Sequence, residues 1–381
     1  MTDTSLLSAY GVLLGMASAC VFVGSRWSLQ TPPKTAELRK NQGLPSEDDE
    51  DEWTAESVSA EDAWWFPVIG SSVLFGLFLL FKYFSKEYIN MLLSGYFALA
   101  GTASITMTAT YIGRSICGVD AWRRITKARV RFAIERYESG SKEPRKPLVD
   151  ISLSHFAIGA SIGAVGIVGA YLYTRHWALS NVIAIALSLN AIALMSLDSF
   201  VTGFIMLGGL FLYDIFWVFG TPVMVNVAKN FDAPIKILWP RNWIEIAVAL
   251  VNRAELPEAK PALLGLGDIV IPGAFVALAL RYDQFIASEA KPGLYFTRFY
   301  RAFSQPYFVA CFCAYVAGLV ATMSVLHVFQ AAQPALLYLS PACAFSVVLV
   351  ALYQGRLAEL WAWTDKSSEG AKAEPSSEKS E

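Results

Sequence analysis

The sequence predicts an all-α polytopic membrane protein with nine transmembrane helices. Hydrophobic residues make up 55% of the 381 residues and charged residues only 16%, whereas soluble domains carry about 25% charged residues. The apolar residues gather in runs of about 20, and such a run crosses the ~30 Å hydrocarbon layer at 1.5 Å per residue. The formal net charge of −2 provides no basic surface, so a nucleic acid is excluded as a partner.

Nine apolar runs define the expected spans. They are residues 6–24, 64–84, 88–113, 153–173, 177–196, 200–220, 262–280, 306–328 and 334–353. The first is expected to be a retained helix, because Met1–Ser5 carries Asp3 and lacks the basic residues that begin a signal peptide.

The distribution of basic residues predicts the orientation. Nine spans place the termini on opposite sides, and more than two thirds of the 30 Lys and Arg residues fall in the loops on one side if the N-terminus is outside. Because cytosolic loops carry the excess of Lys and Arg, we expect a lumenal N-terminus and a cytosolic C-terminus.

Four regions follow from the spans and loops. The first helix and an acidic cytosolic loop occupy residues 1–63, and spans two to five, with a basic cytosolic loop at 114–152, occupy residues 64–199. Spans six to nine occupy residues 200–353 and include a lumenal loop at 221–261. The acidic run Ser46–Glu52 and the tail 354–381 have compositions typical of disorder.

Two carboxylates lie in the middle of apolar spans, where a charge is costly and therefore indicates function. Asp214 lies six residues before Gly220 at the end of span six, and Asp268 lies six residues after Ala262 at the start of span seven. Because these helices are antiparallel, we expect the two carboxylates at the same depth, roughly 9 Å from the outer surface.

Two facing carboxylates share a proton and titrate as a unit. One then acts as a general base toward water and the other as a general acid toward a peptide carbonyl. A secondary transporter that uses the two acids as proton or ion sites is the alternative. A transporter predicts internal repeats, and the spans show none.

Three motifs accompany the aspartates. Tyr213-Asp214 lies in span six, Gly265-Leu266-Gly267-Asp268 in span seven, and Gln333-Pro334-Ala335-Leu336 opens span nine. In this order they resemble the YD, GxGD and PAL motifs of the intramembrane aspartyl proteases, the presenilin and signal peptide peptidase family. Asn226–Pro240 also resembles the signal peptide peptidase branch, and the resemblance covers about 65–353.

The resemblance implies a presenilin-like fold and a role for each motif. Asp214 and Asp268 would be the catalytic pair. Gly265 and Gly267 lack side chains and would let a substrate backbone approach Asp268. The remaining motif residues would shape the substrate site: Tyr213, Leu266, Gln333, Pro334, Ala335 and Leu336. Span nine is expected to begin at Pro334.

The resemblance also implies what the protein acts on. The expected function is hydrolysis of peptide bonds within transmembrane helices in the lipid bilayer, with remnant signal peptides and type II membrane segments as substrates. No metal or organic cofactor is expected. The resemblance leaves open whether the chain forms a homo-oligomer. The shorter branch of the family is that of the endoplasmic reticulum, although the end Ser377–Glu381 lacks its dilysine retrieval signal.

Unwinding of a helical substrate would expose backbone groups that need new partners. The short segment 235–239 lies between two prolines in the lumenal loop. If it is extended, it would pair with the unwound substrate by β-augmentation; an ordinary loop at the membrane surface is the alternative.

Overall fold

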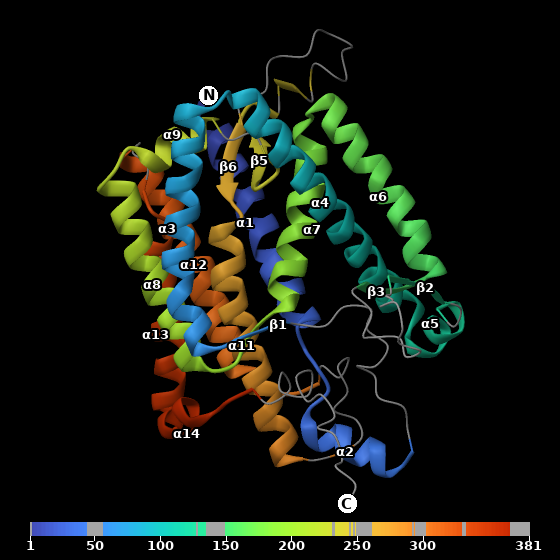
Figure 1. Ribbon diagram of the computed structural model, residues 1–381. Helices are drawn as coiled ribbons and strands as arrows, with labels where there is room; N and C mark the ends of the chain where they lie inside the picture. The colour runs from blue at the N-terminus through green and yellow to red at the C-terminus, as the bar shows by residue number, and fades with distance from the viewer. Residues whose placement is uncertain are drawn as a thin grey trace, which may run out of the picture.

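The computed structural model is a bundle of long helices (Figure 1). It describes residues 2–43, 56–126, 129–134, 149–230, 233–243, 245–246, 248, 261–291, 293, 302–329 and 333–365. The acidic run Ser46–Glu52 and the tail beyond residue 365 lie outside these residues, as does much of the basic loop 114–152. The prediction of disorder from residue 354 is wrong for the start of the tail, because 357–362 form a helix with Leu360 buried.

Among the described residues, nine helices are long and apolar enough to cross a membrane. They are α1 (Thr2–Trp27), α3 (Ala60–Tyr83), α4 (Lys86–Cys117), α6 (His155–Thr174), α7 (Trp177–Leu194), α8 (Phe200–Phe219), α11 (Gly267–Ala290), α12 (Pro306–Phe329) and α13 (Leu336–Tyr353). This confirms the predicted polytopic all-α class and the number of spans.

The remaining elements are short. Within the described residues, four helices and six strands lie outside the spans; the helices are α2 (Pro33–Asn41), α5 (Val119–Ile125), α9 (Val223–Asn230) and α14 (Leu357–Ala362). The strands form two-stranded sheets. Strand β1 (Glu56–Val58) pairs in parallel with β4 (Met195–Leu197). Strand β2 (Arg129–Ile134) is antiparallel to β3 (Val149–Ser154), and β5 (Lys236–Pro240) is antiparallel to β6 (Pro261–Gly265). Sheet β5–β6 lies at one end of the bundle, and α2 and α14 lie at the other (Figure 1).

The predicted seventh span is wrong at both ends. Residues 261–265 form strand β6, and helix α11 begins at Gly267 and continues to Ala290 instead of ending at 280. A short apolar run cannot be assigned to strand or helix by hydrophobicity alone. At the other end, Arg281, Asp283 and Gln284 are buried polar residues that continue the helix.

The predicted start of span nine at Pro334 is also wrong by two residues. Helix α13 begins at Leu336, and the carbonyl of Pro334 accepts from the Leu337 amide in a tight turn that precedes the helix. Such a turn is common at helix ends, so the helix begins two residues after Pro334.

Helix α11 is the centre of the bundle. Every residue from Ala274 to Leu280 is fully buried, as expected for a helix that is apolar on all sides. Helices α1, α7, α8, α12 and α13 contact it. By contrast, α3 and α4 expose large apolar side chains such as Trp64, Leu92 and Leu99, which is appropriate to a surface that faces lipid.

Buried polar contacts fix the end of the bundle opposite β5–β6. Asp283 accepts from the amides of Tyr307 (3.3 Å) and Phe308 (2.8 Å) at the start of α12, and so caps that helix. Arg281 forms a buried ion pair with Asp365, Nε to Oδ2 at 2.8 Å, and donates to the Leu197 carbonyl. These contacts join α11 to α12, to β4 and to the segment after α14.

Candidate active site

Asp214 lies in the middle of α8 and is buried. The backbone N–H of Leu336 donates to its Oδ2 atom at 3.3 Å. Leu336 is the first residue of α13, and no side chain caps this helix from its N-cap residue, Ala335. The Asp214 carboxylate therefore takes the place of a capping group, where the unpaired N–H groups of the helix attract a negative charge.

Asp268 is the second residue of α11 and is half-buried. The expected depth of six residues along a helix is wrong for this residue, because strand β6 occupies the preceding segment. The expected meeting of the two acids is found: the carboxylates of Asp214 and Asp268 lie within electrostatic range of each other. Asp268 follows β6 closely in the chain, because that strand ends at Gly265 and α11 begins at Gly267.

The two motif glycines leave room beside Asp268. A Cβ atom at Gly267 would meet no described atom within 4 Å. A Cβ atom at Gly265 would lie 3.5 Å from Oδ2 of Asp268, so even the smallest side chain there would contact the carboxylate. Leu266 begins the turn into the helix, and its carbonyl accepts from the amides of Ile269 and Val270.

The other motif residues divide into two groups. Pro334, Ala335 and Leu336 are buried and bring the start of α13 to Asp214, while Gln333 before them is half-buried. Tyr213 instead packs toward α3: its ring lies 3.6 Å from the position of a Cβ atom on Gly70 and 6.4 Å from the Trp217 ring, centroid to centroid.

Sheet β5–β6 leads directly into the site. The Leu266 amide donates to the Ile235 carbonyl at 3.0 Å, which extends the register that pairs Ile237 with Leu264. Alternate pairs of an antiparallel ladder exchange hydrogen bonds. Leu238 and Leu263 form the next pair after Ile237 and Leu264, and they therefore direct their N–H and C=O groups away from the sheet.

The two outer edges of the sheet differ. On the β5 edge, Asn181 of α7 accepts from the Leu238 amide at 2.8 Å and donates to the Leu238 carbonyl at 2.6 Å. On the β6 edge, no strand follows within the described part of the chain, and the Leu263 side chain is 61% exposed. The expectation that 235–239 is extended is confirmed for 236–240. The expectation that it offers its edge to a substrate is wrong, because Asn181 closes that edge.

Two residues at the site were missed from the sequence. Asn181 is not indicated by the sequence, because only an ionisable residue is costly enough within a span to indicate function. Tyr315 of α12 is fully buried, and its side chain lies within electrostatic range of Asp268. Its signal was weak, since a tyrosine within an apolar span is equally typical of packing.

No group of three or more His, Cys, Asp and Glu residues within the described ranges is arranged to hold a metal ion. The ionisable groups gathered at the site are the two carboxylates, with the Tyr213 and Tyr315 side chains within their electrostatic range. Two carboxylates with open space beside them provide an acid and a base for hydrolysis.

Comparisons with known proteins agree on one family. The sequence model of the family described as signal peptide peptidase matches residues 50–367. The chain is 36% identical to the signal peptide peptidase of Mus musculus over 381 residues, covering 99% of this chain and 88% of that protein. It is 36% identical to the signal peptide peptidase of Homo sapiens, covering 96% and 86%. It is also 32% identical to a probable intramembrane protease of Schizosaccharomyces pombe, covering 94% and 95%.

Proposed function

We propose, from the premise that this chain belongs to the signal peptide peptidase family and is an intramembrane protease, that Asp214 and Asp268 are its catalytic pair. The matches are to proteases, and they give no support to the transporter alternative. The observation that carries the proposal is that two carboxylates, the buried one of Asp214 and the half-buried one of Asp268, lie within electrostatic range of each other beside open space at Gly267.

The proposed reaction is general acid–base hydrolysis. The ionised carboxylate removes a proton from a water molecule, and the oxygen of that water attacks the peptide carbonyl carbon. The protonated carboxyl donates its proton to the carbonyl oxygen, which gives a tetrahedral diol. Proton transfer to the amide nitrogen then breaks the C–N bond, and a carboxylic acid and an amine leave. The Leu336 amide holds the Asp214 carboxylate in place during these steps.

We further propose that the substrate adds a strand to the outer edge of β6. The backbone groups of an unwound helix need partners inside the membrane, and the outward N–H and C=O groups of Leu263 provide them. Leu263 lies five residues before Asp268 on a strand that leads into α11. A substrate strand on this edge therefore passes the carboxylates, with Gly265 and Gly267 leaving room for its backbone.

The proposed substrates are membrane-spanning helices with a cytosolic N-terminus, such as remnant signal peptides and type II segments. The excess of Lys and Arg in the loops of one side supports this orientation, and the proposed compartment is the endoplasmic reticulum.

The experiment is to incubate the full chain, purified in detergent, with a synthetic signal peptide and to identify the products by mass spectrometry. We expect cleavage within the apolar segment, and loss of this cleavage in Asp268→Asn. An intact peptide with the wild-type protein, or the same products from the variant, would contradict the proposal.

A further inference from the structure

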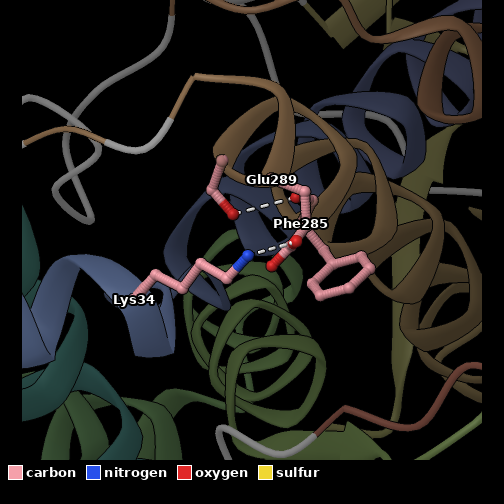
Figure 2. Close-up of polar contacts among 4 residues, drawn as sticks. Lys34, Phe285 and Glu289 are labelled. Atoms are coloured by element: carbon pink, nitrogen blue, oxygen red, sulfur yellow. Dashed lines mark hydrogen bonds and ion pairs between the residues drawn. The ribbon is translucent and has the colours of Figure 1, made fainter.

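A second cavity lies far from the aspartates, at the end of the bundle opposite β5–β6. Its volume is about 840 Å³, within the roughly 300–1,000 Å³ typical of small-molecule sites. The last three turns of α11, the segment from Arg356 to Asp365 and the residues that precede and open α2 line it. Figure 2 shows one wall, where Lys34 of α2 reaches Glu289 of α11 beside Phe285.

The cavity contains buried hydrogen-bonding groups without a protein partner. Tyr282 is 1% exposed and Gln284 is 5% exposed, and both line the cavity. Within the described part of the chain, neither the Tyr282 hydroxyl nor the Gln284 Nε2 atom has a hydrogen-bond partner. Buried polar groups are normally paired, so these two donors indicate a ligand that offers acceptor oxygens.

The charges around the cavity balance. Three basic and three acidic side chains line it: Lys34, Arg281, Arg356, Glu289, Glu359 and Asp365. Lys34–Glu289 and the buried Arg281–Asp365 are closed pairs. Arg356 and Glu359 are 3.6 Å apart, their side chains are 41% and 67% exposed, and both lie within electrostatic range of Tyr282. Arg356 and Glu359 therefore pair with each other across an exposed contact beside Tyr282. Because an exposed ion pair contributes little to stability, a ligand of both charges can take the place of that contact.

The position of the cavity indicates the source of that ligand. Helix α11 has 24 residues, or about 36 Å, so its last turns reach beyond the hydrocarbon layer into the headgroup region. Trp363 lines the cavity, and Trp361 of α14 is 45% exposed nearby in the chain. Tryptophan is enriched at this level of a membrane.

We propose that this cavity binds the headgroup of a zwitterionic phospholipid, a phosphodiester that carries an ammonium group. The phosphate oxygens accept from Arg356 and the Tyr282 hydroxyl, which lie within electrostatic range of each other. The ammonium lies against Glu359 and the Trp363 ring, which attract a cation by charge and by cation–π contact. This site is separate from the proposed catalytic pair, so its test does not depend on proteolysis.

The test is native mass spectrometry of the full chain in detergent with added dioctanoyl phosphatidylcholine. We expect one bound lipid, and about tenfold weaker binding in Tyr282→Phe, which removes only the hydroxyl. Tyr171→Phe is the matched control, because Tyr171 is a buried tyrosine of α6 that does not line the cavity. Arg356→Gln changes an exposed side chain and so tests the phosphate contact without disturbing the core.

Two further ligands identify the chemistry. Dioctanoyl phosphatidylglycerol lacks the ammonium and is expected to bind at least tenfold more weakly. Soluble glycerophosphocholine at the same concentration is expected not to displace the lipid. The proposal is overturned if the wild-type protein binds no lipid, if phosphatidylglycerol binds equally well, if the soluble headgroup displaces the lipid, or if Tyr282→Phe and Arg356→Gln both bind as the wild type does.

Discussion

Asp214 and Asp268 are held in different ways, although we propose that they act as one unit. Asp214 is buried in the middle of α8 and accepts a backbone N–H from the start of α13. Asp268 stands in the first turn of α11 beside two glycines. The first carboxylate is therefore fixed by a neighbouring helix, and the second faces the space that we assign to the substrate backbone.

Gly267 tests that assignment. In Gly267→Val the new Cβ atom meets no described atom, so we expect the protein to fold with an unchanged melting temperature. A β-branched side chain would fill the path of the substrate, and cleavage is expected to fall at least 100-fold. The measurement is the initial rate on a fluorogenic transmembrane peptide.

Gly166→Val is the control for this variant. Gly166 is an exposed glycine of α6 whose Cβ atom would also meet nothing within 4 Å. It carries the same cost of valine in a helix without touching the site. Equal rates for the two variants would show that the space at Gly267 has no role in substrate access.

At the residue scale, the sequence predicts the site best from charged residues within apolar spans, where a charge is costly. A carboxylate within an apolar span is rare, and Asp214 and Asp268 were found on that ground. Asn181 and Tyr315 could not be found in the same way, because an uncharged polar residue is tolerated in a span. The hydrogen bonds of Asn181 to Leu238 depend on tertiary contacts between elements that lie 57 positions apart in the chain.

At the scale of elements, the β5–β6 sheet connects the edge that we propose for substrate binding with the proposed catalytic pair. One edge is closed by Asn181 and the other is open at Leu263. Four residues of β6, 262–265, were expected to be helical, because their composition does not distinguish a strand from a helix. The number of spans was predictable from hydropathy, whereas this boundary depended on pairing with β5.

Leu263→Pro tests the open edge. Its N–H points away from β5 by the register, so proline removes only the outward donor, and proline is tolerated on edge strands in this way. We expect the protein to keep its fold and to bind a transmembrane substrate at least tenfold more weakly, measured as KM. An unchanged KM with a normal melting temperature would refute strand addition at β6.

Asn181→Leu tests the closed edge. The change leaves the backbone groups of Leu238 without partners, at a cost of about 1–3 kcal/mol. We expect a lower melting temperature and additional cleavage positions, because β5 no longer holds β6 in one register. Asn190→Leu is the control: Asn190 is a buried residue of the same helix that bonds to Ser104 and Thr108 of α4. It should lose stability and keep the original cleavage positions; the reverse outcome would contradict the role of Asn181.

At the scale of the whole molecule, the two aspartates and the second cavity are associated with opposite ends of one central helix. Helix α11 begins at the aspartates and ends at the second cavity, and its middle is fully buried. Small residues allow neighbouring helices close to it: a Cβ atom at Gly273 would lie 2.7 Å from Ile192 of α7. The polar residues at its far end, from Arg281 onward, explain why hydropathy ended the span too early.

The orientation of the bundle leads to a prediction about substrates. If the N-terminus is lumenal, the proposed catalytic pair lies in the outer half of the membrane, and the direction of a substrate backbone past it is fixed. Presenilin, which this chain resembles, has the corresponding helices inverted. We therefore expect preference for helices with a cytosolic N-terminus. One apolar helix, placed in both orientations by flanking lysines, measures this preference; equal cleavage of both forms would contradict it.

The most direct test of the central claim is the turnover of Asp214→Asn, Asp268→Asn and the double variant on one transmembrane peptide. Residues that act as a unit have strongly non-additive effects. We expect each single variant to lose at least ~10⁴-fold in kcat, and the double variant to be no worse, with all three expressed and folded as the wild type is. Turnover above about 1% of the wild-type rate in either single variant would contradict the proposal that the two aspartates catalyse the reaction together.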